Sequence, residues 1–323
     1  LEQEITMLNL SENKKELSSK LKQQAIHEGF AVAGIASIPG SSRLKLRSQA
    51  LERWLSNNYH SEMKWMEAER RKNIESLLKG AKSVLSVGFN YISSHHLKNT
   101  KFKIAKYGHG EDYHKVINKK LKNLGKWINI QIPECEWKIC VDTSPLLEKA
   151  WAEEAGLGWI GKNSNLINKK YGSWLTLGFI ILTEELVPDE PSKSICGGCD
   201  KCIEQCPTKA ITEPFVVSSN LCIAYHTIEN RSKIIPKNIR KNLNGWIAGC
   251  DICQDVCPWN REVPENESYE ATPKAWLKTI NSESLDWDDN KWNDTLKGST
   301  LRRIKPWMWK RNIKSVLENN KML

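Results

Sequence analysis

Two short cysteine runs in the second half of the chain constrain its fold most strongly. The first run has three cysteines spaced three residues apart and a fourth, followed by proline, four residues later; it comprises Cys196, Cys199, Cys202 and Cys206. The second run also ends in Cys-Pro and comprises Cys250, Cys253 and Cys257, with Cys222 upstream. This spacing is typical of domains that hold two 4Fe–4S clusters.

In such domains the last cysteine of each run binds the other cluster. The sequence therefore predicts one cluster on Cys196, Cys199, Cys202 and Cys257. It predicts a second cluster on Cys206, Cys222, Cys250 and Cys253. Cys135 and Cys140 lie outside both patterns, and we expect them to be core residues.

Zinc sites and disulfides are two other uses of such cysteines. Structural zinc sites also take four cysteines from CxxC pairs, but the two Cys-Pro ends and the three-then-one spacing favour iron–sulfur clusters. Disulfides are disfavoured, because the sequence shows no signal peptide and is long enough to form a core without them. A reducing cytoplasm is the expected location.

Composition sets the outer limits of the interpretation. The 323 residues, of which 40% are hydrophobic, are enough for two domains with real cores. No apolar run approaches the ~20 residues that a membrane span requires, so we expect no membrane partner. The net charge of +10 favours an anionic partner without specifying one.

The first 190 residues mix helical and strand-like patterns. Helices are expected from Ser11 as a cap to about His27, and within 51–66, 74–78 and 146–155, the last with Ser144 as its cap. Strands are expected over 30–38, 81–91, 137–141 and 174–183. We predict a mixed α/β (α+β) fold with a catalytic domain over 1–190, a cluster domain over 191–265 and a basic helical segment over 266–323.

Two polar groups in the N-terminal domain could carry chemistry. Asp112, Tyr113 and His114 fall at the start of an amphipathic helix, where local capping is the better explanation from this stretch alone. The corrinoid-binding pattern DxHxxG fails there because position 117 is Ile, so the motif does not support cobalt ligation by His114. Asp142 ends a strand ahead of a helix, where a helix cap explains it as well as a catalytic role does. Burial would have to raise its pKa for it to donate a proton near neutral pH.

The stretch Gly156-Leu-Gly-Trp-Ile-Gly161 spells GxGxxG, but it does not predict a dinucleotide site. A helix precedes these glycines, whereas the dinucleotide motif needs a strand before them and a helix that opens on them. The turn that follows can present amides and an amine to a cofactor; it comprises Lys162, Asn163, Ser164 and Asn165.

Basic residues gather on both sides of the second cysteine run. One group lies between Cys222 and Cys250 and comprises Arg231, Lys233, Lys237, Arg240 and Lys241. The other belongs to the C-terminal segment and includes Arg302, Arg303 and Lys305. A solvated surface is the commoner meaning of such runs, but two of them beside a redox centre favour a polyanionic substrate.

Several longer stretches resemble the epoxyqueuosine reductase family, whose members complete queuosine synthesis on tRNA. They include KYGHGEDYHKV, VDTSPLLEKAWAEEAGLGWIGKNSNLI, GCDICQDVCPWN and GSTLRRIKPWMWKRN. The family's usual RYA before DYH is KYG here. The chain is similar to the short form, without a C-terminal helical-repeat extension.

The resemblance implies a base-off cobalamin in the N-terminal domain and an external low-potential electron donor. It implies a monomer that acts on tRNA carrying epoxyqueuosine in the anticodon loop. Asp142 matches the proton donor, and cofactor contacts would fall on Arg71, Tyr107, Asp112, Tyr113, His114, Lys162, Asn163, Ser164 and Asn165. Clusters pass electrons singly, and a cobalt corrin can collect two of them to open an epoxide.

Two alternatives belong to other classes of protein. A ferredoxin-type electron carrier would explain every cysteine of the two runs but would leave the N-terminal domain without a role. A corrinoid reductive dehalogenase would use the same cofactors, although the basic tail suits tRNA better than a small organohalide. A radical S-adenosylmethionine enzyme is excluded because its CxxxCxxC signature does not occur.

Overall fold

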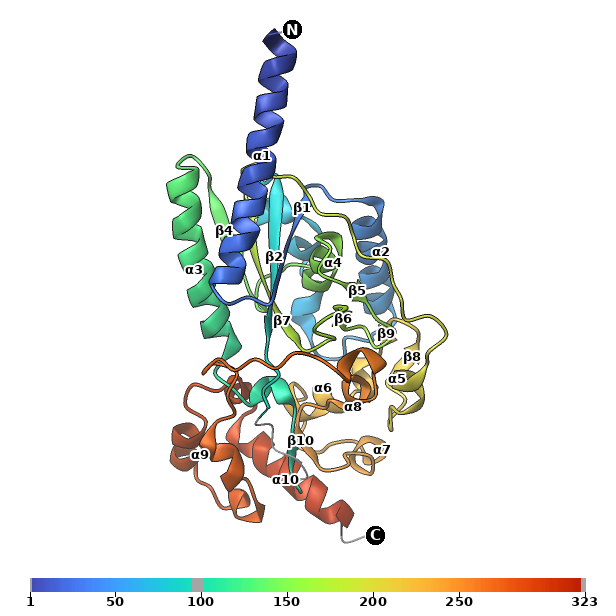
Figure 1. Cartoon of the computed structure of the whole chain (residues 1–323). Coiled ribbons are helices and arrows are strands. Elements are labelled where there is room, and N and C mark those ends of the chain that lie inside the picture. Colours follow the sequence, from blue (N-terminus) through green and yellow to red (C-terminus); the bar gives the residue numbers. More distant parts are fainter. Residues whose placement is uncertain (1, 95–100, 321–323) are drawn as a thin grey trace.

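The computed structural model describes residues 2–94 and 101–320. Its centre is a four-stranded sheet of order β1-β2-β7-β4, in which every neighbouring pair is antiparallel (Figure 1). The strands are β1 (Val32–Ser37), β2 (Ser83–Asn90), β4 (Trp137–Cys140) and β7 (Leu175–Leu182). Because helices cover both faces of the sheet, β2 is buried at every position.

Two pairs of helices enclose this sheet. On one face, α1 (Glu2–His27) and α3 (Tyr113–Gln131) contribute Leu21, Ile117 and Leu121 to a core shared with the strands. On the other face, α4 (Glu148–Glu154) packs Trp151 against the sheet, and α2 (Ser42–Ser56) packs against α4. The N-terminal domain is therefore a three-layer sandwich of helices around a sheet.

The cluster region consists of short elements joined by loops. They are β5 (Trp159–Ile160), β6 (Leu166–Ile167), α5 (Lys201–Glu204), β8 (Ile211–Glu213), β9 (Val216–Val217), α6 (Ile223–Ile228), α7 (Lys237–Arg240), β10 (Trp246–Ala248) and α8 (Ile252–Asp255). A parallel pairing of β10 with β3 (Lys103–Ile104) ties this region to the N-terminal domain. Among the described helices, none is long and apolar enough to cross a membrane.

The C-terminal segment packs on the cluster region and forms a core with it. Helices α9 (Asp289–Thr295) and α10 (Pro306–Asn320) bring Trp292 and Trp309 into a core that includes Ile247. The buried Asn312 amide donates hydrogen bonds to the carbonyls of Thr227 and Ile247, both at 2.8 Å. The segment also reaches the N-terminal domain, because Gly298 O accepts from the backbone N–H of Asp112.

Several predicted boundaries were wrong. Helix α1 begins at Glu2, so Ser11 lies inside it rather than capping it. Helix α2 starts after the Ser41 cap and ends before Asn57 and Asn58, and only 3-10 turns follow up to residue 76. Helix α4 begins at Glu148, because residues 145–147 run into the core through buried Leu146 instead of starting the helix.

Candidate active site and cluster sites

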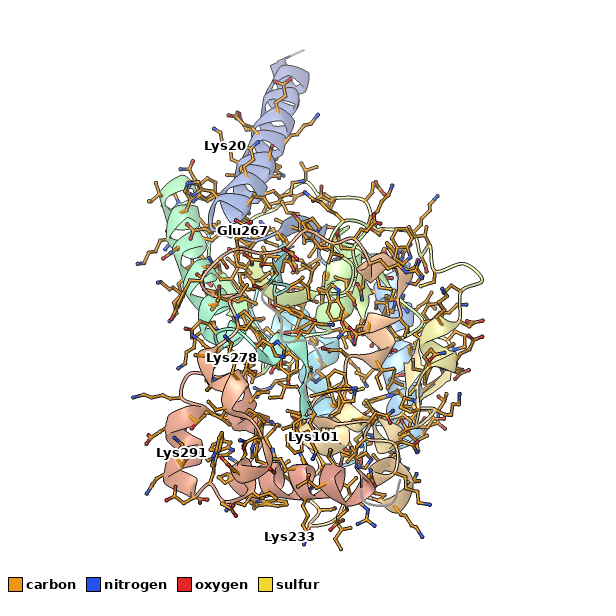
Figure 2. The ribbon with its side chains drawn as sticks, turned by 60° about the horizontal axis from the view of Figure 1, so that its bottom comes forward. Lys20, Lys101, Lys233, Glu267, Lys278 and Lys291 are labelled. Carbon is orange, nitrogen blue, oxygen red and sulfur yellow. The ribbon has the colours of Figure 1, made fainter. Side chains whose placement is uncertain are left out.

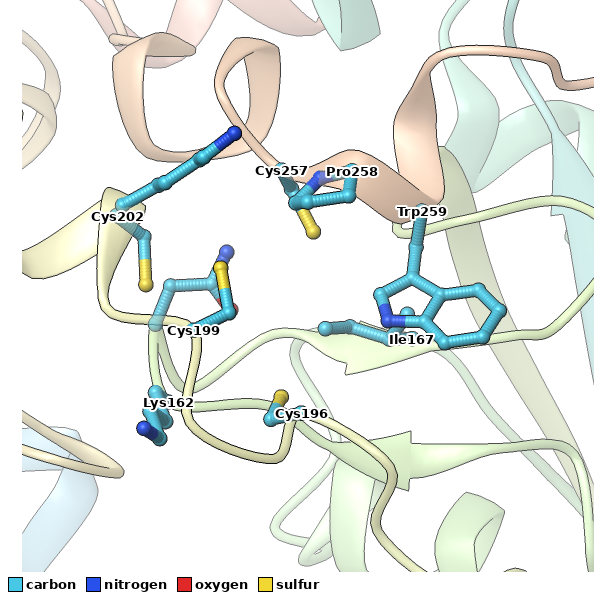
Figure 3. A pocket seen from close by; sticks show the side chains of 10 residues that line it. Lys162, Ile167, Cys196, Cys199, Cys202, Cys257, Pro258 and Trp259 are labelled. Atoms are coloured by element: carbon cyan, nitrogen blue, oxygen red, sulfur yellow. The ribbon is translucent and has the colours of Figure 1, made fainter.

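The first predicted cysteine group surrounds an open space. The thiols of Cys196, Cys199, Cys202 and Cys257 face a cavity with an empty volume of about 370 Å³, and Trp259 closes one side of it (Figure 3). One zinc ion would draw four sulfurs to ~2.3 Å from a single point. An open space among four thiols instead fits an iron–sulfur cube.

The structure also gathers the second predicted group. The Cys253 thiol lies close enough to Cys206, Cys222 and Cys250 for their charges to interact. Burial, followed by this mutual repulsion, raises the pKa of Cys253 well above its usual value. Cys257 interacts instead with Cys196 and Cys199, so the last cysteine of each run crosses to the other group.

Asp142 lies directly after β4 in a strained loop. Its φ of 50° is in the left-handed region, where Asp and Asn are the commonest residues other than glycine. Its backbone N–H donates to Glu148 Oε1 at 2.6 Å, which ties the loop to the first turn of α4. The carboxylate itself remains exposed, with half of its side-chain surface accessible.

His114 connects the start of α3 to this loop. Its Nε2 lies 3.1 Å from Asp142 Oδ2 and its Nδ1 lies 2.8 Å from Asp112 Oδ1. Asp112 is the N-cap of α3, as its place in the sequence suggested. Although burial opposes the charged ring, the two carboxylates outweigh it and raise the pKa of His114 to about 9.

The contact with His114 has the opposite effect on the pKa of Asp142. The hydrogen bond from His114 lowers the pKa of this carboxyl, and burial opposes that effect without reversing it. The condition that burial should raise the pKa of Asp142 is therefore not met. At neutral pH the proton of this pair is held on the imidazole.

Two tyrosines form the wall beside His114. The Tyr113 ring stacks on the imidazole with centroids 4.1 Å apart, and the Tyr107 ring meets Tyr113 edge-on at 6.2 Å. Burial raises the pKa of both phenols, so they stay protonated near neutral pH. They give the site an apolar wall of aromatic rings.

Charged groups line the other side of Asp142. The Arg71 guanidinium donates to Leu146 O at 3.2 Å and interacts electrostatically with Glu148 and Asp142. Burial and the nearby Asp142 charge raise the pKa of Glu148 to about 7. Lys149 donates to Ser164 O at 2.6 Å and interacts with Cys253, which brings the second cysteine group to the edge of the site.

Residues of the turn after β5 contact both the cluster region and the Asp142 side of the molecule. Lys162 pairs with Asp200 at 2.6 Å and lines the first cluster cavity. Asn163 lines that cavity as well and donates to Cys253 O at 3.3 Å. Ser164 accepts from Lys149, and the Asn165 backbone N–H donates to Asn163 Oδ1. Lys162 and Asn163 thus serve the cluster region rather than the Asp142 group.

The predicted tRNA-binding residues lie on the C-terminal side of the molecule. Lys237, Lys241, Arg302 and Lys305 are exposed, while Arg240 pairs with Glu318 at 3.4 Å. Lys233 packs over the Trp307 ring at 4.4 Å and lies at the outer edge of the molecule in Figure 2. Arg231 is held by Arg303 O and Met308.

The sequence did not predict that Arg303 lies near Asp142. It pairs with Glu229 at 2.7 Å, stacks over Trp65 at 5.1 Å and interacts electrostatically with Asp142. Sequence reasoning also missed Glu148 and Lys149. Their only signal was their place in the first turn of the helix that follows Asp142.

Comparisons with known proteins match these features. A family model described as "4Fe-4S double cluster binding domain" covers residues 195–260, and "Epoxyqueuosine reductase QueG, DUF1730" covers residues 71–143. The "Epoxyqueuosine reductase" of Prochlorococcus marinus (strain NATL2A) is 54% identical over 94% of this chain and 98% of its own length. That of Synechocystis sp. (strain ATCC 27184 / PCC 6803 / Kazusa) is 48% identical over 84% and 95%.

Solved structures agree in fold. A crystal structure of epoxyqueuosine reductase with an epoxyqueuosine-modified tRNA-Tyr stem loop has a TM-score of 0.84 at 26% identity, and covers 95% of this chain and 82% of its own. The Streptococcus thermophilus structure has a TM-score of 0.79 at 27% identity, and covers 93% and 80%.

The fold and its sites define an iron–sulfur oxidoreductase with a double 4Fe–4S cluster domain attached to a three-layer α/β domain. The chain belongs to the epoxyqueuosine reductase family, since it matches those relatives over nearly its whole length.

Proposed function

We propose that this protein reduces epoxyqueuosine in tRNA to queuosine. Its relatives carry the name of that reaction, and a solved relative holds the modified stem loop. The main support for the proposal is the Asp142–His114 pair. Glu148 connects this pair to the start of α4, where Lys149 interacts with Cys253 of the second cysteine group. An acid and an electron source therefore meet at one edge of the α/β domain.

The reaction removes one oxygen atom from the substrate. The epoxide takes up two electrons and two protons, both of its C–O bonds break, and an alkene and one water molecule are formed. The leaving oxygen needs a proton, because an alkoxide is a poor leaving group. A well-placed acid typically contributes roughly 100- to 10,000-fold in rate.

We assign that acid to Asp142, which draws its proton from His114. The carboxylate is exposed to the site, whereas the imidazole is held between Asp112 and Asp142 and stays protonated to about pH 9. The Bacillus subtilis relative is described with the catalytic loop of its own aspartate swung out of the active site. In this chain the Asp142 loop is fixed by Glu148.

The proposal includes a cobalamin next to Asp142. The carboxylate of Asp142 and the ammonium group of Lys149 suit the amide groups of a corrin, and Tyr107 and Tyr113 offer an apolar wall. A bound corrin would supply a cobalt nucleophile that collects two electrons. Both ring nitrogens of His114 face carboxylates, so the protonated ring has no free lone pair with which to bind cobalt. We propose the base-off form from the resemblance to the family.

Electrons would enter at the first cluster from an external low-potential donor and pass to the second. The Gly197–Gly198 turn beside that cluster is exposed, and apart from the chain neighbours no described residue lies within 4 Å of a β-carbon added at either glycine. We further propose a monomer that works in the cytoplasm, where tRNA is available.

Expression in a bacterium that lacks its own epoxyqueuosine reductase tests this function. Nucleoside analysis of total tRNA should show queuosine restored and epoxyqueuosine lost with the wild-type chain but not with Asp142→Asn. Persistent epoxyqueuosine in cells that contain the folded, cluster-loaded wild-type protein would contradict the proposal.

A further inference from the structure

Helix α3 carries a lysine face that the sequence analysis did not single out. The helix has five lysines and no acidic residue over its whole length. Four of them, Lys115, Lys119, Lys122 and Lys126, are exposed and line a shallow, open hollow on the outer side of the helix. In Figure 1, α3 forms the left flank of the molecule, and no other ribbon covers its outer side.

The positive charge of this face is not taken up by ion pairs. Across the described residues, none of the four lysines lies within ion-pair distance of a carboxylate, although Lys115 interacts electrostatically with Asp112. Lys120 differs, because it turns towards the body of the protein, donates to Glu28 O at 2.9 Å and pairs with Glu270 at 3.5 Å. The helix thus separates one paired lysine from four unpaired ones.

The lysine face begins at the active site. His114 lines the same hollow as the four lysines, and its ring contacts Asp142. Arg303 of the C-terminal segment also interacts with Asp142. Asp142 therefore lies between a basic surface on α3 and the basic C-terminal segment.

We propose that the lysine face of α3 binds phosphates of the substrate tRNA, in addition to the C-terminal residues. This inference rests on the proposed function. From Lys115 to Lys126 the helix rises by ~16 Å. A nucleic-acid strand rises by roughly 3.4 Å per nucleotide, so the face is long enough for several phosphates next to the modified nucleotide.

The chemistry of the face favours RNA over an acidic protein. Stable protein interfaces have an apolar centre with aromatic anchors, but the other residues of this hollow are Asn118, Asn123 and His114. Lysine and asparagine side chains are common phosphate contacts. The lysine face is also continuous with the Asp142–His114 site, which in the proposed function acts on a tRNA nucleotide. This continuity again favours RNA.

Binding of a synthetic anticodon stem loop, measured by fluorescence anisotropy over a range of salt concentrations, tests the proposal. The variant Lys119→Glu/Lys122→Glu reverses two charges on an exposed helix face, and glutamate is a good helix former. We expect affinity to fall about tenfold or more, and the log–log salt slope to fall by about one unit for each lost phosphate contact.

The control makes the same charge change elsewhere. Lys45→Glu/Arg53→Glu alters two exposed basic residues of α2, on the other face of the sheet. If the inference holds, this control changes affinity less than threefold. Equal losses of affinity in both variants would show only an effect of net charge. No loss of affinity in the α3 variant would show that the lysine face does not bind RNA. Either result overturns the inference.

Turnover separates this inference from the proposed function. The α3 variant should keep its kcat at saturating tRNA while its KM rises. If the wild-type protein forms no queuosine at all, the proposed function fails. If wild-type and α3 variant form it with the same KM, only the assignment of the lysine face fails.

Discussion

His114 and Asp142, 28 residues apart in sequence, meet through an imidazole Nε2 to carboxylate Oδ2 contact of 3.1 Å. Because Asp112 holds the other ring nitrogen, the imidazole lies between two carboxylates. The pKa of the imidazole rises to about 9 and that of the Asp142 carboxyl falls. We propose that the pair acts as one acid, whose proton is stored on His114 and delivered at Asp142.

Asp142→Asn should lower turnover by about 100-fold or more, because the amide has no carboxyl proton to transfer. Asparagine also adopts a positive φ readily, so the loop at φ 50° should keep its shape. The measurement is the single-turnover rate with pre-reduced protein, together with iron content. Near-normal queuosine formation would instead leave Tyr113, His114 or water as the donor.

The pH dependence of the rate should report His114. The ring is protonated below its raised pKa of about 9, so the rate should be level near neutral pH and fall about tenfold per pH unit above 9. Asp112→Asn removes one of the two carboxylates that raise this pKa. Its alkaline limb should move to lower pH, and an unchanged limb would show that His114 is not the proton store.

Glu148 should act by positioning the Asp142 loop. Glu148→Gln keeps an oxygen that can accept from the Asp142 backbone N–H, whereas Glu148→Ala does not. We expect the alanine variant to lose about tenfold in kcat, of the order of a lost hydrogen bond to a charged group, and the glutamine variant to recover most of it. Equal rates in both variants would argue against positioning by this contact.

The cluster assignment predicts different outcomes for two buried cysteines. Wild-type protein purified without oxygen should hold about eight irons per chain. Cys257→Ala should lose about half of them, because it removes one ligand of the first cluster only. Cys140 ends β4 with its side chain in the core, so Cys140→Ala should keep all of the iron. Saturation of the cysteines with zinc and less than half of the expected iron would contradict the assignment.

The cluster ligands could be predicted in detail because they are encoded by the spacing of cysteines within short stretches of sequence. Metal ligands have fixed spacing, and the crossed pairing of Cys257 and Cys206 follows from that spacing alone. The structure places both cysteines in the predicted groups. The start of α3 could be predicted for a similar reason, since Asp112 caps its own helix.

The relationships that assemble the active site depend on tertiary packing and could not be predicted in the same way. His114 and Asp142 meet because α3 begins and β4 ends at the same edge of the sandwich. Arg303 reaches Asp142 only because the C-terminal segment folds back onto the cluster region. Predicted helix boundaries were wrong where tertiary packing overrides the local sequence pattern. At α4, residue 146 was the predicted start, but Leu146 is buried in the core and the helix begins at Glu148.

The most direct test of the account uses purified, cluster-loaded protein, a chemical reductant and tRNA that carries epoxyqueuosine, with and without added cobalamin. Mass spectrometry of the digested tRNA measures the product. The account predicts a nucleoside lighter by one oxygen atom only when cobalamin is present. Equal conversion without any cobalamin bound, or no conversion with both clusters and cobalamin in place, would contradict it.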